Sequence, residues 1–489
     1  MGGDVPPRSD MPGPPPFPRI PELAGLTSYA QAARIGLSVD ENVARLLRYH
    51  WVERRLMAIA VSRLPATPEW EVKCALALHQ WQSAEHVDAL RRRIAEMRSP
   101  APSLDDPPNP ALDAFLSEVL HSGDTVELLT GLYRATLPAI ADAYRRHIAA
   151  SNPLVDQPTV RVLRVALGDS DDAVVWGARA VSAVLAGDPA ARRRAEEWEA
   201  HLRAFLTAAG GIAGDAVVPA ALPSRYDDDE ARSVPASRSL PPRRATSAFE
   251  PDMTPRRDQR FSGTHDFDFP PHVVYAAADV PADERNLALL AKRTLEMDVP
   301  EMMASVMIER TDLPWEFQLD WSRQLWDEAR HAMMGTVALA ARGIDWTRLP
   351  LNVGFSLRLN LHATAAERQA MLFAIEQSLM PGDTGKRSEY ETAVASGDAL
   401  SAHFHDYDWA DEVLHARIGR RWIQHDGLTV QQAMDKAREV HLRTWAALER
   451  YREAPAAGDW WDDFVRRALG RPSALTAEQR KAPPEIIPE

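Results

Sequence analysis

The sequence of 489 residues predicts an all-α protein that consists of two four-helix bundles in tandem. Apolar residues recur at three- and four-residue intervals through residues 38–206 and again through residues 281–450, which is the spacing of amphipathic helices. One register of matching residues relates these two stretches and indicates an internal repeat. Two copies of a short acidic motif that ends in histidine are typical of metal-binding helical bundles.

The composition along the chain predicts four segments after a Pro-rich arm at residues 1–20. We expect a first helical bundle at residues 21–206 and a linker rich in Pro, Ser and charge at residues 207–280. A second helical bundle follows at residues 281–450. Residues 451–489 are expected to form a C-terminal tail, frayed or disordered from about residue 470.

The composition also excludes several classes of protein. A formal net charge of −14 argues against a nucleic-acid-binding surface. No apolar run approaches the roughly 20 residues of a membrane span, and residues 1–20 lack the apolar core of a secretion signal. The lone Cys74 rules out an intramolecular disulfide and fits a reducing compartment. We therefore expect a cytoplasmic protein without a nucleic-acid or membrane partner.

The two acidic motifs are D-E-A-R-H at residues 327–331 and D-E-V-L-H at residues 411–415. Each motif places Glu and His three residues apart, so both side chains lie on one face of a helix, one turn apart. A third E-x-x-H at residues 118–121 lacks the preceding Asp and is interpreted as chance. The paired motifs predict two ligand-bearing helices of one metal site.

A metal site of this kind needs one further Glu from each of two partner helices. Glu296 and Glu328 are equally far from the turn near Asp312, so on an antiparallel hairpin they lie at the same height. Glu301 lies nearer the turn, by roughly 7 Å at 1.5 Å per residue, and is the second choice. Pro300 predicts a kink or a helix start beside these residues.

The third helix offers two candidate ligands, Glu376 and Glu367, of which Glu376 lies nearer the level of Glu412. On the fourth helix, His405 and Asp408 lie upstream of Glu412 on a similar face and are candidates for an outer position or an extra ligand.

The expected site joins four carboxylates to two imidazoles. The carboxylates offset the charge of two divalent cations, and the neutral imidazoles leave positions free for oxygen or substrate. Asp327 and Asp411 point away from the Glu of their own motif, and each is expected to accept the free N–H of the opposite imidazole.

The motif D-E-x-R-H resembles the signature of the ferritin-like di-iron carboxylate superfamily, and the run from Asp411 to Trp422 resembles one ferritin-like family within it. The resemblance covers about residues 283–425 and implies ferritin-like bundles. It also implies a dinuclear iron or manganese site whose ligands are Glu296, Glu328, His331, Glu376, Glu412 and His415.

These residues lead us to expect an O₂-dependent dinuclear non-haem iron oxidase or oxygenase that acts on a small organic substrate. A dimanganese, catalase-like centre and a non-catalytic metal-binding or structural protein are the alternatives. The chain shows no flavin, nicotinamide or iron–sulfur motif, so electrons would come from a separate reductase or from the substrate.

The first copy lacks the carboxylates at the ligand positions. The repeat register places these residues there: Trp51, Ser83, Tyr133, Ser170 and Ala173. Only His86 matches a ligand, so we expect a metal-free bundle with a structural or gating role, for example as the contact surface of a homodimer.

Overall fold

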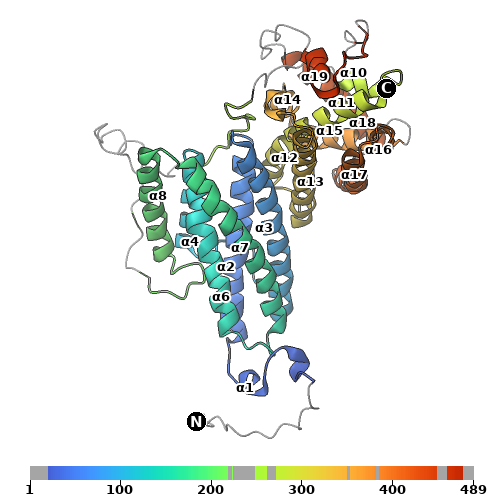
Figure 1. Cartoon of the computed structure of the whole chain (residues 1–489). Helices are drawn as coiled ribbons and strands as arrows, with labels where there is room; N and C mark the ends of the chain where they lie inside the picture. The colour runs from blue at the N-terminus through green and yellow to red at the C-terminus, as the bar shows by residue number, and fades with distance from the viewer. Residues whose placement is uncertain are drawn as a thin grey trace, which may run out of the picture. The chain divides into compact units, whose positions relative to one another are not determined.

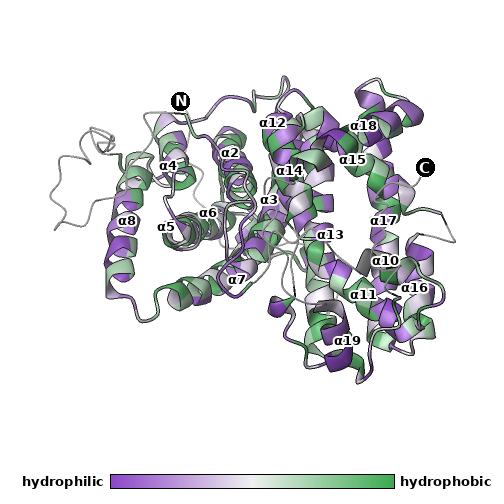
Figure 2. Ribbon diagram, turned by 90° about the horizontal axis from the view of Figure 1, so that it is seen from above, coloured by the Kyte–Doolittle hydropathy of each residue, from purple (hydrophilic) through white to green (hydrophobic). Residues whose placement is uncertain are grey.

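The computed structural model describes residues 20–218, 223, 248–261, 271–349, 353–381, 385–448, 460–476 and 479. Within these residues all regular elements are helices, which confirms the all-α prediction (Figure 1). Hydrophobic and hydrophilic residues alternate along the helices of both units (Figure 2). Among the described helices, none combines the length and the apolar character that crossing a lipid bilayer would require.

The chain forms two compact units. Unit 1 comprises Met1–Leu56 and Gln82–Phe249, and unit 2 comprises Met57–Trp81 and Glu250–Glu489. This division differs from the predicted one because residues 57–81, where α2 ends and α3 begins, belong to the second unit. Nothing in the sequence signals this boundary, because both helices continue through it.

The helices of unit 1 are η1 (Leu23–Gly25), α1 (Tyr29–Ala32), parts of α2 (Val39–Arg63) and α3 (Trp70–Met97), α4 (Pro110–Leu120), α5 (Thr125–Thr130), η2 (Gly131–Thr136), α6 (Leu137–Ala150), α7 (Gln157–Val184) and α8 (Pro189–Ala208). Helix α8 begins where the Asp188 side chain accepts hydrogen bonds from the first backbone N–H groups. Beyond α8, Arg48 donates to the carbonyls of Ala209, Gly211 and Ile212, so the segment predicted as a linker begins with packed residues. Residues 219–222, 224–247 and 262–270 of that segment lie outside the described residues.

The helices of unit 2, besides its parts of α2 and α3, are α10 (Pro271–Ala276), α11 (Ala282–Leu295), α12 (Asp298–Glu309), α13 (Trp315–Ala340), η3 (Trp346–Arg348), α14 (Gly354–His362), α15 (Ala365–Ser378), α16 (Lys386–Ala395), α17 (Ala399–His425), α18 (Val430–Leu448) and α19 (Trp460–Leu469). Helix α13 packs against α11, α12 and α17, and α17 also packs against α15 and α16. Two glycines permit close approaches, because a Cβ at Gly335 would meet Arg293 and a Cβ at Gly419 would meet Phe373.

The first long helical stretch of unit 2 is interrupted at Glu296. Helix α11 ends at Leu295 and α12 begins at Asp298. Pro300 explains the break, because proline lacks an N–H and its ring collides with the carbonyl four residues earlier, that of Glu296. The Asp298 side chain accepts hydrogen bonds from the backbone of Phe355 and Ser356, at 2.9 and 3.2 Å, and so holds the start of α14.

The predicted C-terminal tail contains a helix in its described part. Trp461 and Phe464 of α19 are buried in a core shared with Leu287 and Leu290 of α11. Glu284 accepts hydrogen bonds from the chain that follows α19. The position of α19 is therefore determined by the packing of its apolar face on α11, which lies almost 180 residues earlier in the sequence.

Candidate metal centre

The six predicted ligands come together inside unit 2. Glu296 lies at the break between α11 and α12, and the other five lie on α13, α15 and α17. The side chains of Glu328, His331, Glu412 and His415 are at most 4% exposed, and that of Glu296 is 12% exposed. Helical spacing explains the motif pairs, since residues three apart face the same side of α13 or α17.

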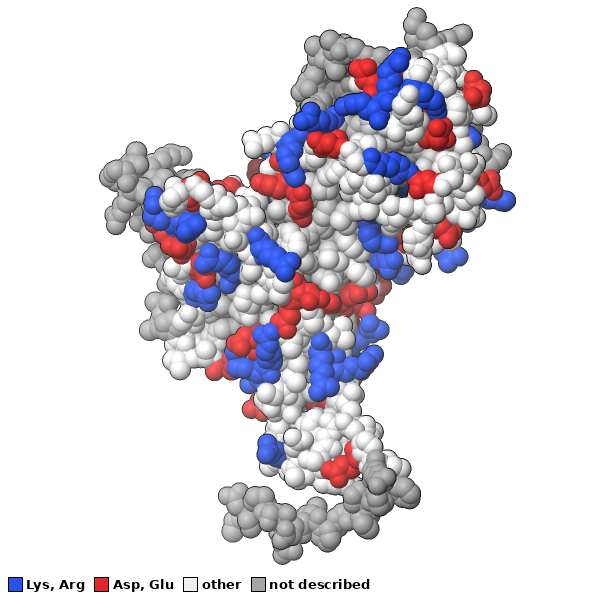
Figure 3. Space-filling view, in the orientation of Figure 1, with Lys and Arg blue, Asp and Glu red and all other residues white. Residues whose placement is uncertain are grey.

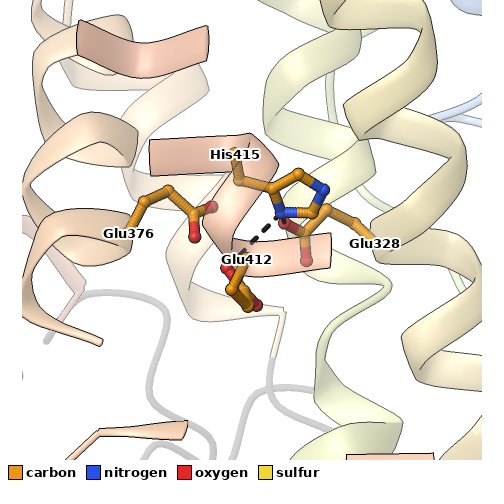
Figure 4. Close-up of side chains that lie close together, drawn as sticks. All are labelled: Glu328, Glu376, Glu412 and His415. Carbon is orange, nitrogen blue, oxygen red and sulfur yellow. Dashed lines mark ion pairs between the residues drawn. The ribbon is translucent and has the colours of Figure 1, made fainter. Parts of the chain in front are cut away.

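Four of these residues form the first ligand group, defined as Glu328, Glu376, Glu412 and His415. One potential ligand atom of each lies within 4.8 Å of those of the others. Figure 4 shows the three carboxylates and the imidazole pointing toward one another. His415 Nδ1 lies 3.2 Å from Glu328 Oε1 and 3.4 Å from Glu412 Oε2. Gln324 Nε2 donates to Glu376 Oε1 at 3.0 Å and holds that carboxyl group in place.

The second ligand group is defined as Glu296, His331 and Asp408, whose ligand atoms also lie within 4.8 Å of one another. His331 Nδ1 lies 3.2 Å from Asp408 Oδ1 and 3.9 Å from Glu296 Oε2. Asp408, which the sequence placed either outside the site or as an extra ligand, is thus a member of this group.

Two carboxylates connect the two groups. Glu328 places Oε2 3.7 Å from His331 Nδ1 and Oε1 3.2 Å from His415 Nδ1. Glu412 places Oε1 4.0 Å from His331 Nδ1 and Oε2 3.4 Å from His415 Nδ1. The imidazole centroids are 5.8 Å apart. Each carboxylate therefore offers one oxygen to each of two neighbouring cation positions.

Outside the groups, each imidazole contacts the Asp of the opposite motif. His331 Nε2 lies 3.1 Å from Asp411 Oδ2, and His415 Nε2 lies 3.4 Å from Asp327 Oδ2, which confirms the predicted pairing. Arg330 donates to both Asp side chains. With Nε2–H directed at a carboxylate, the Nδ1 atom of each ring is left for the ligand group.

Five buried ligand atoms make no aligned hydrogen bond: Glu328 Oε1, His331 Nδ1, Glu376 Oε2, Glu412 Oε2 and His415 Nδ1. Their mutual contacts of 3.2 Å and longer bring charges close without the geometry of a hydrogen bond. A buried polar atom without a partner costs about 1–3 kcal/mol. Bound divalent cations would satisfy all five, so the residues present fit metal ions.

When no metal is bound, the electrostatic environment favours the protonated forms of three of the candidate ligands. Burial, together with the charge of Glu412, raises the pKa of Glu376 well above its ordinary value. Burial opposes the charging of His331, yet Asp408 and the neighbouring carboxylates raise its pKa to about 10. Burial opposes the charging of His415 as well, yet the nearby carboxylates of Asp327, Glu328 and Glu412 raise its pKa well above its ordinary value. Metal binding therefore has to displace protons.

Two cations beside the second ligand group were missed by the sequence analysis. Lys386 Nζ lies 2.7 Å from Glu412 Oε1, 3.0 Å from Asp408 Oδ1 and 3.8 Å from Glu296 Oε1. Arg293 Nη1 donates to both oxygens of Glu296, each at 2.8 Å, and to Asp408 Oδ1 at 2.6 Å. The spacing of Arg293, one turn before Glu296, was a visible signal, whereas nothing in the sequence marks Lys386.

The alternative ligands lie elsewhere. Glu301 is fully buried and pairs with Lys73 at 2.5 Å and with Arg257 at 2.6 Å. Glu367 caps α15 and pairs with Arg443. His405 contacts Arg293 at 3.0 Å, on the outer side of the second ligand group.

The chance motif at residues 118–121 has no counterpart of this arrangement. Glu118 contacts His201 at 2.8 Å, while His121 Nδ1 contacts the backbone carbonyl of Ser117 at 2.7 Å.

In unit 1, each ring nitrogen of His86 lies within hydrogen-bond distance of a carboxylate. His86 Nδ1 lies 3.1 Å from Glu53, and His86 Nε2 lies 3.0 Å from Asp169. Tyr144 donates to Glu53 at 2.7 Å. His86 is therefore a hydrogen-bonded buried histidine, and its two carboxylate partners do not come from the predicted ligand positions. Burial would lower the pKa of His86, but the two carboxylates raise it to about 9.

One of the predicted replacements in unit 1, Tyr133, fills space. Tyr133 packs against the Trp176 ring, with centroids 5.1 Å apart, and against Gly177, where a Cβ would collide with it. Ser170 donates to the carbonyl of Ala166, and Ala173 is buried.

On the face shown in Figure 3, acidic and basic residues are interspersed without one extended basic stripe, in keeping with the acidic composition.

Comparison with models of protein families, with curated proteins and with solved structures gave no match for this chain. The interpretation of the site therefore rests on its own geometry.

Proposed function

We propose that unit 2 binds two divalent metal ions, iron in the leading case, and acts as an O₂-dependent oxidase or oxygenase on a small organic substrate. The observation that supports this most is the convergence of five buried ligand atoms without hydrogen bonds. Glu328 and Glu412 lie between the two imidazoles and suit the role of bridging ligands. Carboxylate and imidazole together form an oxygen-rich ligand set that suits iron or manganese.

The protein groups around such a site have separate tasks. Two iron ions would supply the electrons for the reduction of O₂. Asp327 and Asp411 orient the imidazoles, and Gln324 orients Glu376. The burial of the ligands keeps bulk water away from the centre, which protects reactive species from side reactions.

We also infer that the two units are copies of one ferritin-like four-helix bundle. In unit 1, Tyr49 of α2 contacts the α6 backbone, and His86 of α3 contacts α2 and α7. The pair His86–Asp169 takes the repeat positions of His331–Asp411, at 3.0 and 3.1 Å. Gly177 and Gly419 take equivalent positions too, and each meets an aromatic residue of the neighbouring helix.

Metal analysis combined with O₂ uptake tests this function. The full chain, loaded anaerobically with Fe²⁺, should hold close to two irons and consume O₂ on exposure to air, with a change in iron absorption. Evolution of O₂ from peroxide by manganese-loaded protein would favour the catalase-like alternative. Metal bound without any reaction toward O₂ or peroxide, with candidate substrates and a chemical reductant present, would favour storage or structure.

A further inference from the structure

The two ligand groups differ in how their charge is balanced. In the first ligand group, Lys386 contacts Glu412. In the second ligand group, both carboxylates are already paired with cations. Arg293 contacts Glu296 and Asp408, and Lys386 lies within 4.0 Å of the same two side chains.

Lys386 lies where a second metal ion would compete with it. The three carboxylates within 4.0 Å of its Nζ atom are those of Glu412, Asp408 and Glu296. The same three carboxylates lie within 4.0 Å of His331 Nδ1. The Lys386 ammonium group, which is 1% exposed, therefore contacts two oxygens, Asp408 Oδ1 and Glu412 Oε1, that any cation bound by His331 would also approach.

Charge repulsion makes this sharing unfavourable for a divalent ion. Two cations a few ångströms apart in a buried site repel each other strongly, and the effective dielectric there is well below that of water. Arg293 is held by Glu296, Glu389 and Asp408, so it is anchored from several sides. Lys386 begins α16 and carries its charge on a flexible four-carbon stem, so it is the group able to withdraw.

We propose that the two metal positions are unequal, and that Lys386 sets the order in which they fill. The first ligand group binds one divalent ion tightly, and the second group binds its ion weakly, once the ammonium group has moved away. This inference rests on the proposed metal-binding function and specifies how the site is loaded. A protein of this kind holds one metal at low metal concentration and two at high concentration.

Titration of metal-free full-length protein with Mn²⁺ tests the proposal, followed by calorimetry and by electron paramagnetic resonance. The native chain should bind one equivalent tightly and a second at least about tenfold more weakly. The first equivalent should give the spectrum of an isolated Mn²⁺ ion, and spin coupling should appear only with the second. The variant Lys386→Met should tighten the second equivalent at least about tenfold.

Two variants serve as controls. Lys292→Met removes a neighbouring ammonium group that pairs with Glu389 at 2.6 Å, outside both ligand groups, and should keep the native inequality. Lys386→Arg keeps the positive charge and should also keep the inequality between the two metal positions. If Lys386→Met does not fold, the spectra of the native chain during titration still decide whether the positions are unequal.

The outcomes separate this inference from the proposed function. Two equally tight, spin-coupled ions in the native chain would overturn the inference and leave the function standing. An unchanged second equivalent in folded Lys386→Met would overturn the role of Lys386. No binding of Mn²⁺ or Fe²⁺ by the native chain would overturn the proposed function itself.

Discussion

Both units place a buried histidine against an aspartate of a neighbouring helix, yet the other side of each ring differs. In unit 1, His86 Nδ1 meets Glu53, and Tyr144 donates to the same carboxylate. In unit 2, His331 Nδ1 makes no hydrogen bond and faces the ligand groups. One arrangement is complete within the protein, and the other leaves a buried ring nitrogen that a cation could contact. The difference shows that a buried His–Asp pair can serve a cation only where the other helices leave the second ring nitrogen without a hydrogen-bond partner.

Removal of one of the two carboxylates between the imidazoles should have the largest effect on metal binding in unit 2. We expect Glu328→Ala or Glu412→Ala to abolish most metal binding, because each side chain serves both cation positions. Elemental analysis after reconstitution measures this. Glu391→Ala, on the exposed side of α16, is the control and should bind metal as the native chain does. Native metal content in both bridging variants would contradict the site.

The pH should change metal affinity in unit 2 strongly. The pKa of Glu376 is raised, and that of His331 is raised to about 10, so metal replaces protons at neutral pH. Affinity for Mn²⁺ should therefore rise with pH, by about tenfold per pH unit for each proton displaced. Calorimetry in buffers of different ionisation enthalpy counts the protons released. A pH-independent affinity would mean that the ligands are already deprotonated without metal.

Substitutions of Glu296 and Glu301 should have different effects, one mainly on metal binding and the other mainly on stability. Glu301→Gln should destabilise the protein by about 3–5 kcal/mol, because it leaves Lys73 and Arg257 buried without a full counter-charge. Its metal content should stay native under folding conditions. Glu296→Gln should instead reduce metal content at the second ligand group with a smaller loss of stability. Denaturant titration and elemental analysis of the two variants together would show whether these roles are reversed.

The smallest expected effect concerns the pH dependence of stability in unit 1. The pKa of His86 is raised from 6.5 to about 9, so its charged form is favoured by folding. This contribution, about 3 kcal/mol, is fully present below pH 6.5 and is lost as pH rises through about 9. Urea unfolding between these pH values should show the decline. His86→Gln should remove it, and a decline of the same size in that variant would assign it to another group.

The sequence by itself determined the helical class, the predicted ligands and the Asp partners of both imidazoles. These depend on the period of the helix, which fixes which residues share a face. Only the tertiary structure decided the rest, namely that Lys386 and Arg293 occupy the second ligand group, that Glu53 closes unit 1, that Glu301 pairs with Lys73, and that α19 packs on α11. These contacts join residues far apart in the chain or follow irregular segments. Their positions depend on which helices pack together, and helical periodicity carries no information about that.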